Sequence, residues 1–319
     1  MKNNIYFFCL LVILQIAACT PSSYFSETNR LETLGKLSPK KSLKVHRLDL
    51  SGENLKELPA NFNQFSQLQF LNLSKNPNLD LRKTFEKLKI FEQLKVLLLD
   101  SNQIEQLPEN IVELKQLTQL SLAGNPEIEL AYLTDLLVNC FQLNALNLSN
   151  NRIDELPKNF IQLSQLKNLR LSNNQLNDST DFDILGKLKL KILWLDDNQI
   201  TRLPENVGNL NVVELYLDNN SITKIPQSMS GCNQLCVLYL GQNQFEKLPV
   251  EFIEMKMLKF LVMNQNKINF IPTIYGEQPH PIQAMVLDGN QLSKEELEKV
   301  EQYFGSMFLI SYRNQMKTP

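Results

Sequence analysis

The stretch "LWLDDNQITRLP" (residues 193–204) decides the fold, because "LYLDNNSITKIP" (residues 215–226) repeats its pattern 22 residues later. Leu, Asn, Ile and Pro recur at matching places, whereas Trp194 is replaced by Tyr216. A fixed period of about 20 to 50 residues is typical of solenoid proteins. The letters that stay fixed therefore predict a repeated structural unit, and the letters that vary are where function should be sought.

The pattern L-x-x-L-x-L-x-x-N-x-L-x-x-L-P extends over most of the chain. Asn fills its ninth position in ten of eleven units, and Glu53 replaces it in the first. The units begin 22 to 26 residues apart, at Val45, Leu68, Leu94, Leu117, Leu143, Leu166, Leu190, Val212, Leu235, Leu258 and Ile282. This pattern resembles the leucine-rich repeat family over about residues 43–292. The resemblance implies an α/β solenoid, a curved horseshoe with a parallel β-sheet on its concave face and short helices or 3₁₀ turns on its convex face.

Elementary geometry explains the fixed letters. In the L-x-L segment the two Leu side chains point the same way from a short strand, so stacked strands bury them in one continuous core. The Asn amide is expected to satisfy backbone groups in the buried bend after the strand. Pro near the end of the template fixes the backbone where the chain starts its return.

The convex side is predicted from the segments between strands. In "ENIVELKQL" (residues 109–117), Ile111, Leu114 and Leu117 lie three residues apart, which indicates a helical or 3₁₀ turn. The two 26-residue units, which begin at Leu68 and Leu117, replace L-P with longer apolar segments. We expect these extra residues to lengthen the convex helix.

The chain divides into four predicted parts. Residues 1–18 form a signal peptide, residues 19–42 a tether and N-terminal cap, and residues 43–292 the repeats. Residues 293–319 form a C-terminal cap helix and tail, because Ser293 and the Glu three places later make a capping-box arrangement. At the other end, "SETNRLETL" (residues 26–34) is interpreted as a short covering helix.

The N-terminus has the features of an export signal. Residues 5–18 are a 14-residue apolar run, too short to span a bilayer and well sized for a signal-peptide core. Ala17 and Ala18 directly before Cys19 resemble the bacterial lipobox, in which the Cys sulfur takes the lipid. The resemblance implies an exported protein, lipid-anchored to a bacterial membrane through Cys19, on its periplasmic or its cell-surface side. An ordinary signal peptide with a chance Cys is the alternative.

Composition and side-chain inventory argue against several functions. The formal net charge is −2, so there is no basic excess for a nucleic-acid partner. His46 and His280 are the only histidines; both are interpreted as surface residues, and neither pairs with a nucleophile. We expect no enzyme activity, no cofactor and no metal site, with a hydrolase using surface carboxylates as a remote alternative. A disulfide between Cys232 and Cys236 stays open.

The variable positions of each repeat, the second, third, fifth, seventh and eighth, are predicted to face outward on the concave sheet. In repeats seven to ten they bring together the only Trp, two Tyr, several apolar residues and acids. The predicted ligand-binding patch consists of Ile192, Trp194, Asp196, Asp197, Glu214, Tyr216, Asp218, Val237, Tyr239, Phe260 and Val262. Repeats four to six present a more polar surface, with Asn144, Asn147, Asn150, Lys167, Asn168 and Arg170.

Exposed Trp and Tyr anchor protein interfaces, so the sequence favours binding of a protein or peptide through the concave face. We expect the protein to be a monomer. The acids of the patch would favour a basic partner. A glycan is an alternative, since aromatic faces stack on sugar rings, and the protein would then be an adhesin. A purely structural envelope component is another alternative, in which the aromatics only fill neighbouring strands.

Overall fold

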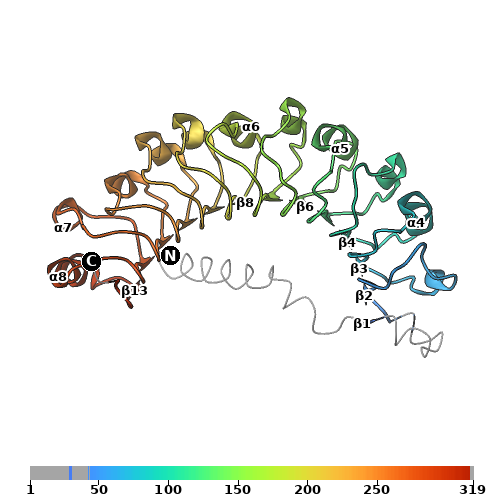
Figure 1. Cartoon of the computed structure of the whole chain (residues 1–319), viewed down its shortest axis with the longest axis horizontal. Helices are drawn as coiled ribbons and strands as arrows, with labels where there is room; N and C mark the ends of the chain where they lie inside the picture. Colours follow the sequence, from blue (N-terminus) through green and yellow to red (C-terminus); the bar gives the residue numbers. More distant parts are fainter. Residues whose placement is uncertain (1–28, 31–41, 43, 317–319) are drawn as a thin grey trace, which may run out of the picture.

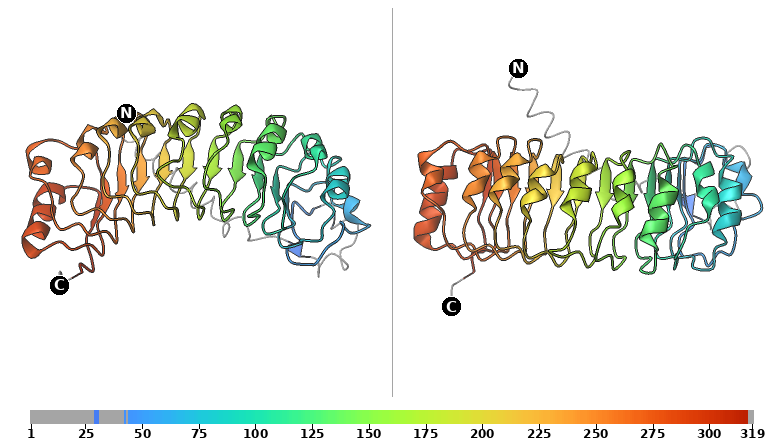
Figure 2. Two further views of the ribbon diagram at one scale, coloured as in Figure 1. Left: turned by 45° about the horizontal axis from the view of Figure 1, so that its top comes forward. Right: turned by 90° about the horizontal axis from the view of Figure 1, so that it is seen from above.

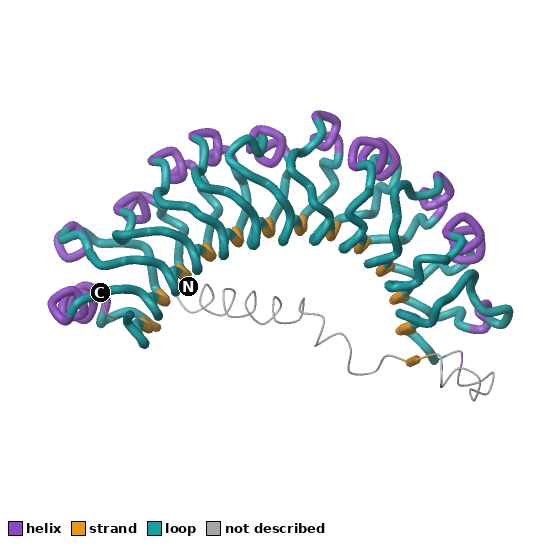
Figure 3. Tube along the Cα trace, viewed as in Figure 1, coloured by secondary structure: helices purple, strands orange, loops and turns teal. Residues whose placement is uncertain are grey.

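The computed structural model describes residues 29–30, 42 and 44–316. Its repeats stack into an arc with strands along the inner face and helices along the outer face (Figures 1 and 3). The described strands form one 13-stranded sheet in which every strand lies parallel to its neighbours in chain order. The prediction of an α/β solenoid with a concave parallel sheet is therefore confirmed.

The strands are short and evenly registered. Each pairs with the next so that equivalent template positions lie side by side, as Leu193 does with Leu215. Apart from the two-residue β1, each spans three residues. Their bounds are β1 Asn29–Arg30, β2 Arg47–Asp49, β3 Phe70–Asn72, β4 Val96–Leu98, β5 Gln119–Ser121, β6 Ala145–Asn147, β7 Asn168–Arg170, β8 Ile192–Trp194, β9 Glu214–Tyr216, β10 Val237–Tyr239, β11 Phe260–Val262, β12 Ala284–Val286 and β13 Leu309–Ser311.

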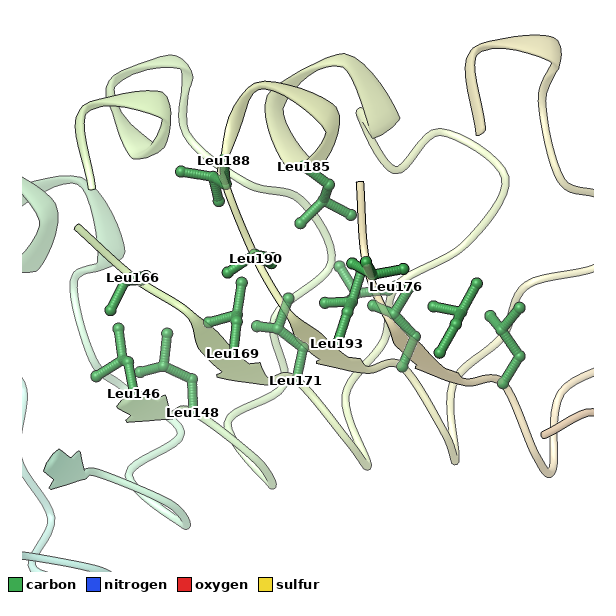
Figure 4. Close-up of a cluster of buried hydrophobic side chains, with 14 of the residues drawn as sticks. Leu146, Leu148, Leu166, Leu169, Leu171, Leu176, Leu185, Leu188, Leu190 and Leu193 are labelled. Atoms are coloured by element: carbon green, nitrogen blue, oxygen red, sulfur yellow. The ribbon is translucent and has the colours of Figure 1, made fainter. Parts of the chain in front are cut away.

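The core lies between the sheet and the convex elements. Leu169 lies in β7 and Leu171 directly follows it. Their side chains point to the same side of the sheet and are fully buried, as are their equivalents in the neighbouring repeats (Figure 4). Each repeat therefore contributes a layer of Leu side chains that packs on the layers before and after it. This continuous burial stabilises the stack in place of a central globular core.

Short helices cover the convex face, seen from above in Figure 2. Pro precedes five of the six 3₁₀ turns, where its fixed φ suits the first turn. The 26-residue units carry eight-residue α-helices instead, which confirms that their extra residues lengthen the convex helix. The bounds are η1 Phe62–Gln64, α4 Leu81–Leu88, η2 Glu109–Glu113, α5 Leu130–Leu137, η3 Lys158–Gln162, α6 Phe182–Lys187, η4 Glu205–Asn209, η5 Gln227–Gly231, η6 Val250–Glu254, α7 Ile274–Glu277 and α8 Lys294–Phe304.

The ninth-position asparagines form a buried ladder along the turns. Asn220 donates through Nδ2 to the carbonyl oxygens of Leu195, Leu217 and Asp218 at 3.0, 3.1 and 3.2 Å. Its Oδ1 accepts from the backbone N–H of Ile200 at 3.0 Å. One side chain thus satisfies four buried backbone groups in two repeats, which confirms the role predicted for this Asn.

The eighth position differs from the prediction that it faces outward from the sheet. It lies in the turn after the strand, in the left-handed region: φ is 57° at Asp197, 50° at Asn219 and 68° at Gly124. Asn, Asp and Gly tolerate that conformation better than other residues. The presence of Asp197 in one opening stretch and Asn219 in the other is therefore explained in part by backbone geometry, because both residue types tolerate a positive φ.

Both ends of the sheet differ from the predicted caps. Asn29 and Arg30 form β1 beside β2, within the segment interpreted as a covering helix. At the other end α8 begins at Lys294 after the N-cap residue Ser293, whose Oγ accepts from the Glu296 N–H at 3.2 Å, but β13 follows it and pairs with β12. Helix α8 is therefore the convex element of a unit that leads into one more strand.

The added unit escaped the template because Gln315 stands where Asn is expected. Gln315 Nε2 donates to the carbonyl oxygens of Leu287 and Tyr312 at 3.0 Å, and its Oε1 accepts from the Leu292 N–H, as the asparagines do. No strand among the described residues lies beyond β13, and Leu309 is 50% exposed. In the described part of the chain no helix combines the length and apolarity needed to cross a bilayer.

Candidate ligand-binding surface

Three aromatic side chains form a stack on the concave face, which we call the aromatic column. Because β8, β9 and β10 pair in register, their fifth positions lie one above another. The ring centroids of Trp194 and Tyr216 are 5.3 Å apart and those of Tyr216 and Tyr239 4.5 Å apart, with interplanar angles of 15° and 11°. The Arg170 guanidinium carbon lies 4.7 Å from the centroid of Trp194 and extends the row.

This stacking covers the ring faces. Both faces of Tyr216 meet an aromatic neighbour, and Trp194 has Arg170 on one side and Tyr216 on the other. All three rings are half-buried, so solvent reaches mainly their edges. Ring edges carry the positive part of the aromatic quadrupole, so the column suits acceptor groups and edge contacts better than stacking on a flat ligand.

Two residues of the predicted patch are not available at the surface. Glu214 is 1% exposed and Val237 is 4% exposed, although their third positions were expected to face a ligand. The reason is the size of the aromatic rings, which cover the third positions beside them. The Tyr216 hydroxyl donates to Glu214 Oε2 at 3.0 Å, and burial raises the pKa of Glu214 to about 7.

The acids beside the column hold turns of the solenoid. Asp218 Oδ1 accepts from the Gly241 N–H at 2.8 Å, and Asp196 Oδ1 accepts from Ser172 Oγ at 2.8 Å. Burial raises the pKa of Asp196 and raises that of Asp218 to about 6. Asp197 is exposed and accepts from the Asn219 amide. These bonds give Asp196 and Asp218 a structural use, so only part of the predicted acidic border is available to a partner.

The remaining predicted residues flank the column. Ile192 lies beside Trp194 on β8, and Phe260 and Val262 on β11 pair with β10, all three half-buried. The structure therefore brings the predicted residues together on β8 to β11 and the turns after β8 and β9. Their side chains pack against one another there and form a closed surface.

A hollow lies next to the aromatic column, on the concave face between β3 and β8. Its volume is about 230 Å³. Its floor is the strand backbone at Leu120 and Leu146, whose side chains point into the core, and it opens because the neighbouring outward residues Ser121 and Ala145 are small. Bulkier residues border it at both ends: Phe70, Val96 and Leu98 at one, Arg170 and Trp194 at the other.

Polar groups complete the lining of the hollow. Asp100 Oδ1 accepts from Ser121 Oγ and from the Ala123 N–H, and burial raises the pKa of Asp100. Asn147 Nδ2 donates to Ser121 Oγ at 2.9 Å. Gln119 and Asn168 also line the hollow. The hollow therefore combines apolar walls with amide groups and one cation, Arg170.

Of these residues, the sequence singled out Trp194 for the ligand site and noted Asn147, Asn168 and Arg170 only as a polar surface. The missing signal was size: between Leu98 and Arg170 the fifth positions carry Ser121 and Asn147, and Ala145 stands in the adjoining third position. Small outward residues on consecutive strands, with bulky ones on both sides, predict a depression of the sheet.

The described residues show no cluster suited to metal binding. They contain no group of three or more His, Cys, Asp and Glu side chains suited to holding a metal ion. Cys232 is a buried thiol that donates to the Val207 carbonyl oxygen, so it forms no disulfide with Cys236. His280 corrects a prediction, because it is half-buried against Tyr275 and Phe304 and is not a surface residue.

The stacked repeats form a solenoid whose concave sheet carries a hollow and an aromatic column. Solenoid proteins use such extended concave surfaces for binding. The sequence matches the leucine rich repeat family at residues 210–268, and again at residues 142–163 and 189–210. The fold and these matches identify the chain as a leucine-rich repeat protein. The comparison with curated proteins gave no significant match.

Solved structures share this fold at low sequence identity. An internalin (inlF) from Listeria monocytogenes is 21% identical with a TM-score of 0.58, and the match covers 88% of this chain and 84% of that one. A chain of the Drosophila Toll–Spatzle complex is 23% identical with a TM-score of 0.62, over 85% of this chain and 38% of that one. A chain of the TLR13–ssRNA13 complex is 21% identical with a TM-score of 0.61, over 79% and 40%. This chain thus spans less than half of the Toll-complex and TLR13-complex chains.

Proposed function

We propose that this protein binds a protein or peptide partner on its concave face, at the hollow and the adjoining aromatic column. The observation that carries the proposal is the hollow of about 230 Å³ that ends on Trp194. A side chain of a partner fills such a depression, and the half-buried Trp194 and Tyr216 supply anchors beside it. The fold supports an interaction role, because leucine-rich repeat proteins act chiefly in recognition.

The aromatic column favours a protein over a glycan. Sugar rings stack on open aromatic faces, and the faces of Trp194 and Tyr216 are covered by their neighbours. The lining of the hollow is also mainly apolar, through Leu98, Ala145 and Trp194. An apolar side chain of a peptide matches this lining better than a hydroxylated ring does.

Selection of random linear peptides displayed on phage against the purified protein tests the proposal. Selected peptides should bind the wild type and lose affinity for Ala145→Phe, in which an added ring fills the hollow. Ala131→Phe makes the same change on the exposed convex face of α5 and should bind as the wild type does. Gln119→Phe, at an exposed position of β5 that lines the hollow, provides a second blocking variant.

Trp194 gives an independent readout, because it is the only Trp in the chain. A peptide seated in the hollow should shift or quench its fluorescence, and Ala145→Phe should abolish that change. Selected peptides that bind both Phe variants of the hollow as tightly as the wild type would refute concave-face binding.

We further propose that the protein is exported and anchored to a bacterial membrane through a lipidated Cys19. The apolar run of residues 5–18 and the small residues before Cys19 support this, and they lie outside the described residues. Wild-type protein should partition with membranes, and Cys19→Ala should not. Labelling of intact cells with an impermeant reagent distinguishes a surface location from a periplasmic one.

A further inference from the structure

Charge is distributed unequally along the concave face and its margins. In repeats two to six the outward and turn positions of the template carry four cations and one acid, which are Lys75, Lys95, Lys167, Arg170 and Asp100. In repeats seven to eleven the same positions carry two cations and five acids, which are Lys191, Lys259, Asp196, Asp197, Glu214, Asp218 and Asp288. The half that contains the hollow is therefore positive, although the whole chain has a net charge of −2.

Arg170 is the cation best placed to meet a ligand. Trp194 holds its guanidinium at 4.7 Å, and both side chains line the hollow. Arg170 forms no ion pair with any of the described residues, although six other Lys and Arg residues of the described chain do. Its position on a stacked ring is fixed before binding, which lowers the entropy cost of pairing with a carboxylate.

The one acid in the lining does not oppose an acidic ligand directly. Asp100 Oδ1 already accepts two hydrogen bonds, from Ser121 and from Ala123. It belongs to the turn after β4, three strands away from β7, which carries Arg170. Parallel strands lie about 4.8 Å apart, so this separation is on the order of 14 Å.

We propose that the hollow accepts a bulky apolar side chain from an extended acidic segment of a partner protein, and that a carboxylate of this segment pairs with Arg170. The inference rests on the proposed function, and it adds the chemistry of the partner. The apolar side chain contacts Leu98, Ala145 and Trp194, and the carboxylate meets the edge of the Arg170 guanidinium that Trp194 leaves open. The positive half of the concave face orients the segment and accelerates its association.

The selected peptides test this chemistry directly. Their sequences should be enriched in Asp or Glu within a few residues of a Leu, Ile, Met, Phe or Trp. Arg170→Gln should weaken their binding roughly tenfold or more, and Arg170→Lys should weaken it less. Arg82→Gln, an equal change of charge on exposed α4, should have little effect. Binding of the wild type should also weaken as ionic strength rises.

The failure of this inference differs from the failure of the proposed function. Peptides that lose affinity for Ala145→Phe and Gln119→Phe, but carry no acidic residue or bind Arg170→Gln normally, would overturn the acidic partner and leave concave-face binding intact. If no selected peptide is sensitive to the Phe variants of the hollow, both proposals fall.

Discussion

The ninth-position asparagine is the residue on which each turn depends. Asn220 donates to three carbonyl oxygens and accepts from the buried N–H of Ile200. Asn220→Ala should lower the free energy of unfolding by about 1 to 3 kcal/mol, because the Ile200 N–H loses its partner while each carbonyl oxygen keeps a second donor. Urea denaturation followed by circular dichroism measures the change. Asn233→Ala, at an exposed position, should cost little, and equal losses in the two variants would contradict this account.

A second prediction at this scale concerns the buried carboxyl of Glu214. Its pKa is about 7 in the folded protein and near the ordinary 4.5 in the unfolded chain. The folded state therefore binds one more proton between these values, so the free energy of unfolding falls as pH rises through this window, by roughly 3 kcal/mol.

Glu214→Gln removes this titration. The variant should lose less stability than the wild type between pH 4.5 and pH 8, measured by melting temperature at intervals of pH. Asp218, whose pKa is also raised, is present in both proteins and cancels from the comparison. Glu205→Gln, at an exposed site, should keep the wild-type slope. The same slope in Glu214→Gln would disprove the role of Glu214.

At the scale of elements, the convex turns of repeats seven and eight pack closely at Gly208. A Cβ on Gly208 of η4 would lie 2.2 Å from the carbonyl oxygen of Ser228 in η5, so one of the two turns would have to move. Gly208→Ala should destabilise the protein by about 1 to 3 kcal/mol through overpacking. Glu205→Ala, on the exposed side of η4, is the matched control in the same denaturation experiment. An unchanged midpoint for Gly208→Ala would show that the turns separate easily.

The elements that the sequence predicted are those that depend on residues recurring at fixed positions of the repeat. Leu at alternating positions and Asn after the strand sufficed for β3 to β12, and the Leu pattern alone for β2, because these residues act through backbone geometry that recurs along the stack. Strand β13 escaped because Gln315 performs the Asn function with a longer side chain. The hollow escaped because it depends on the small size of Ser121 and Ala145 relative to bulky residues on other strands, far away in the sequence.

The sequence predicted which residues form the aromatic column, but it did not predict how their stacking changes the surface. Trp194, Tyr216 and Tyr239 were recognised because equivalent positions of a solenoid stack. Their mutual stacking, which buries Glu214 and leaves ring edges exposed, depends on χ angles that the sequence pattern does not specify. The nature of the surface, and with it the favoured class of ligand, therefore required the structure.

At the scale of the whole molecule, a solenoid couples each repeat mainly to its neighbours. Asn198 and Asn220 both donate to the carbonyl oxygen of Leu195, each at 3.0 Å. Removing one leaves that oxygen a partner, and removing both leaves it none. The double variant Asn198→Ala/Asn220→Ala should therefore lose more stability than the sum of the single variants, by about 0.5 kcal/mol or more.

Distant asparagines should behave differently. Asn102 donates to the Leu73 carbonyl oxygen and Asn266 to that of Leu240, at opposite parts of the arc with no shared partner. Their double variant should be additive within about 0.5 kcal/mol. Urea titrations of both double-mutant cycles make the comparison. Coupling of equal size in the two cycles would mean that distant repeats are energetically coupled. Coupling confined to Asn198 and Asn220 would establish that stability, like the concave surface, depends on contacts between adjacent repeats.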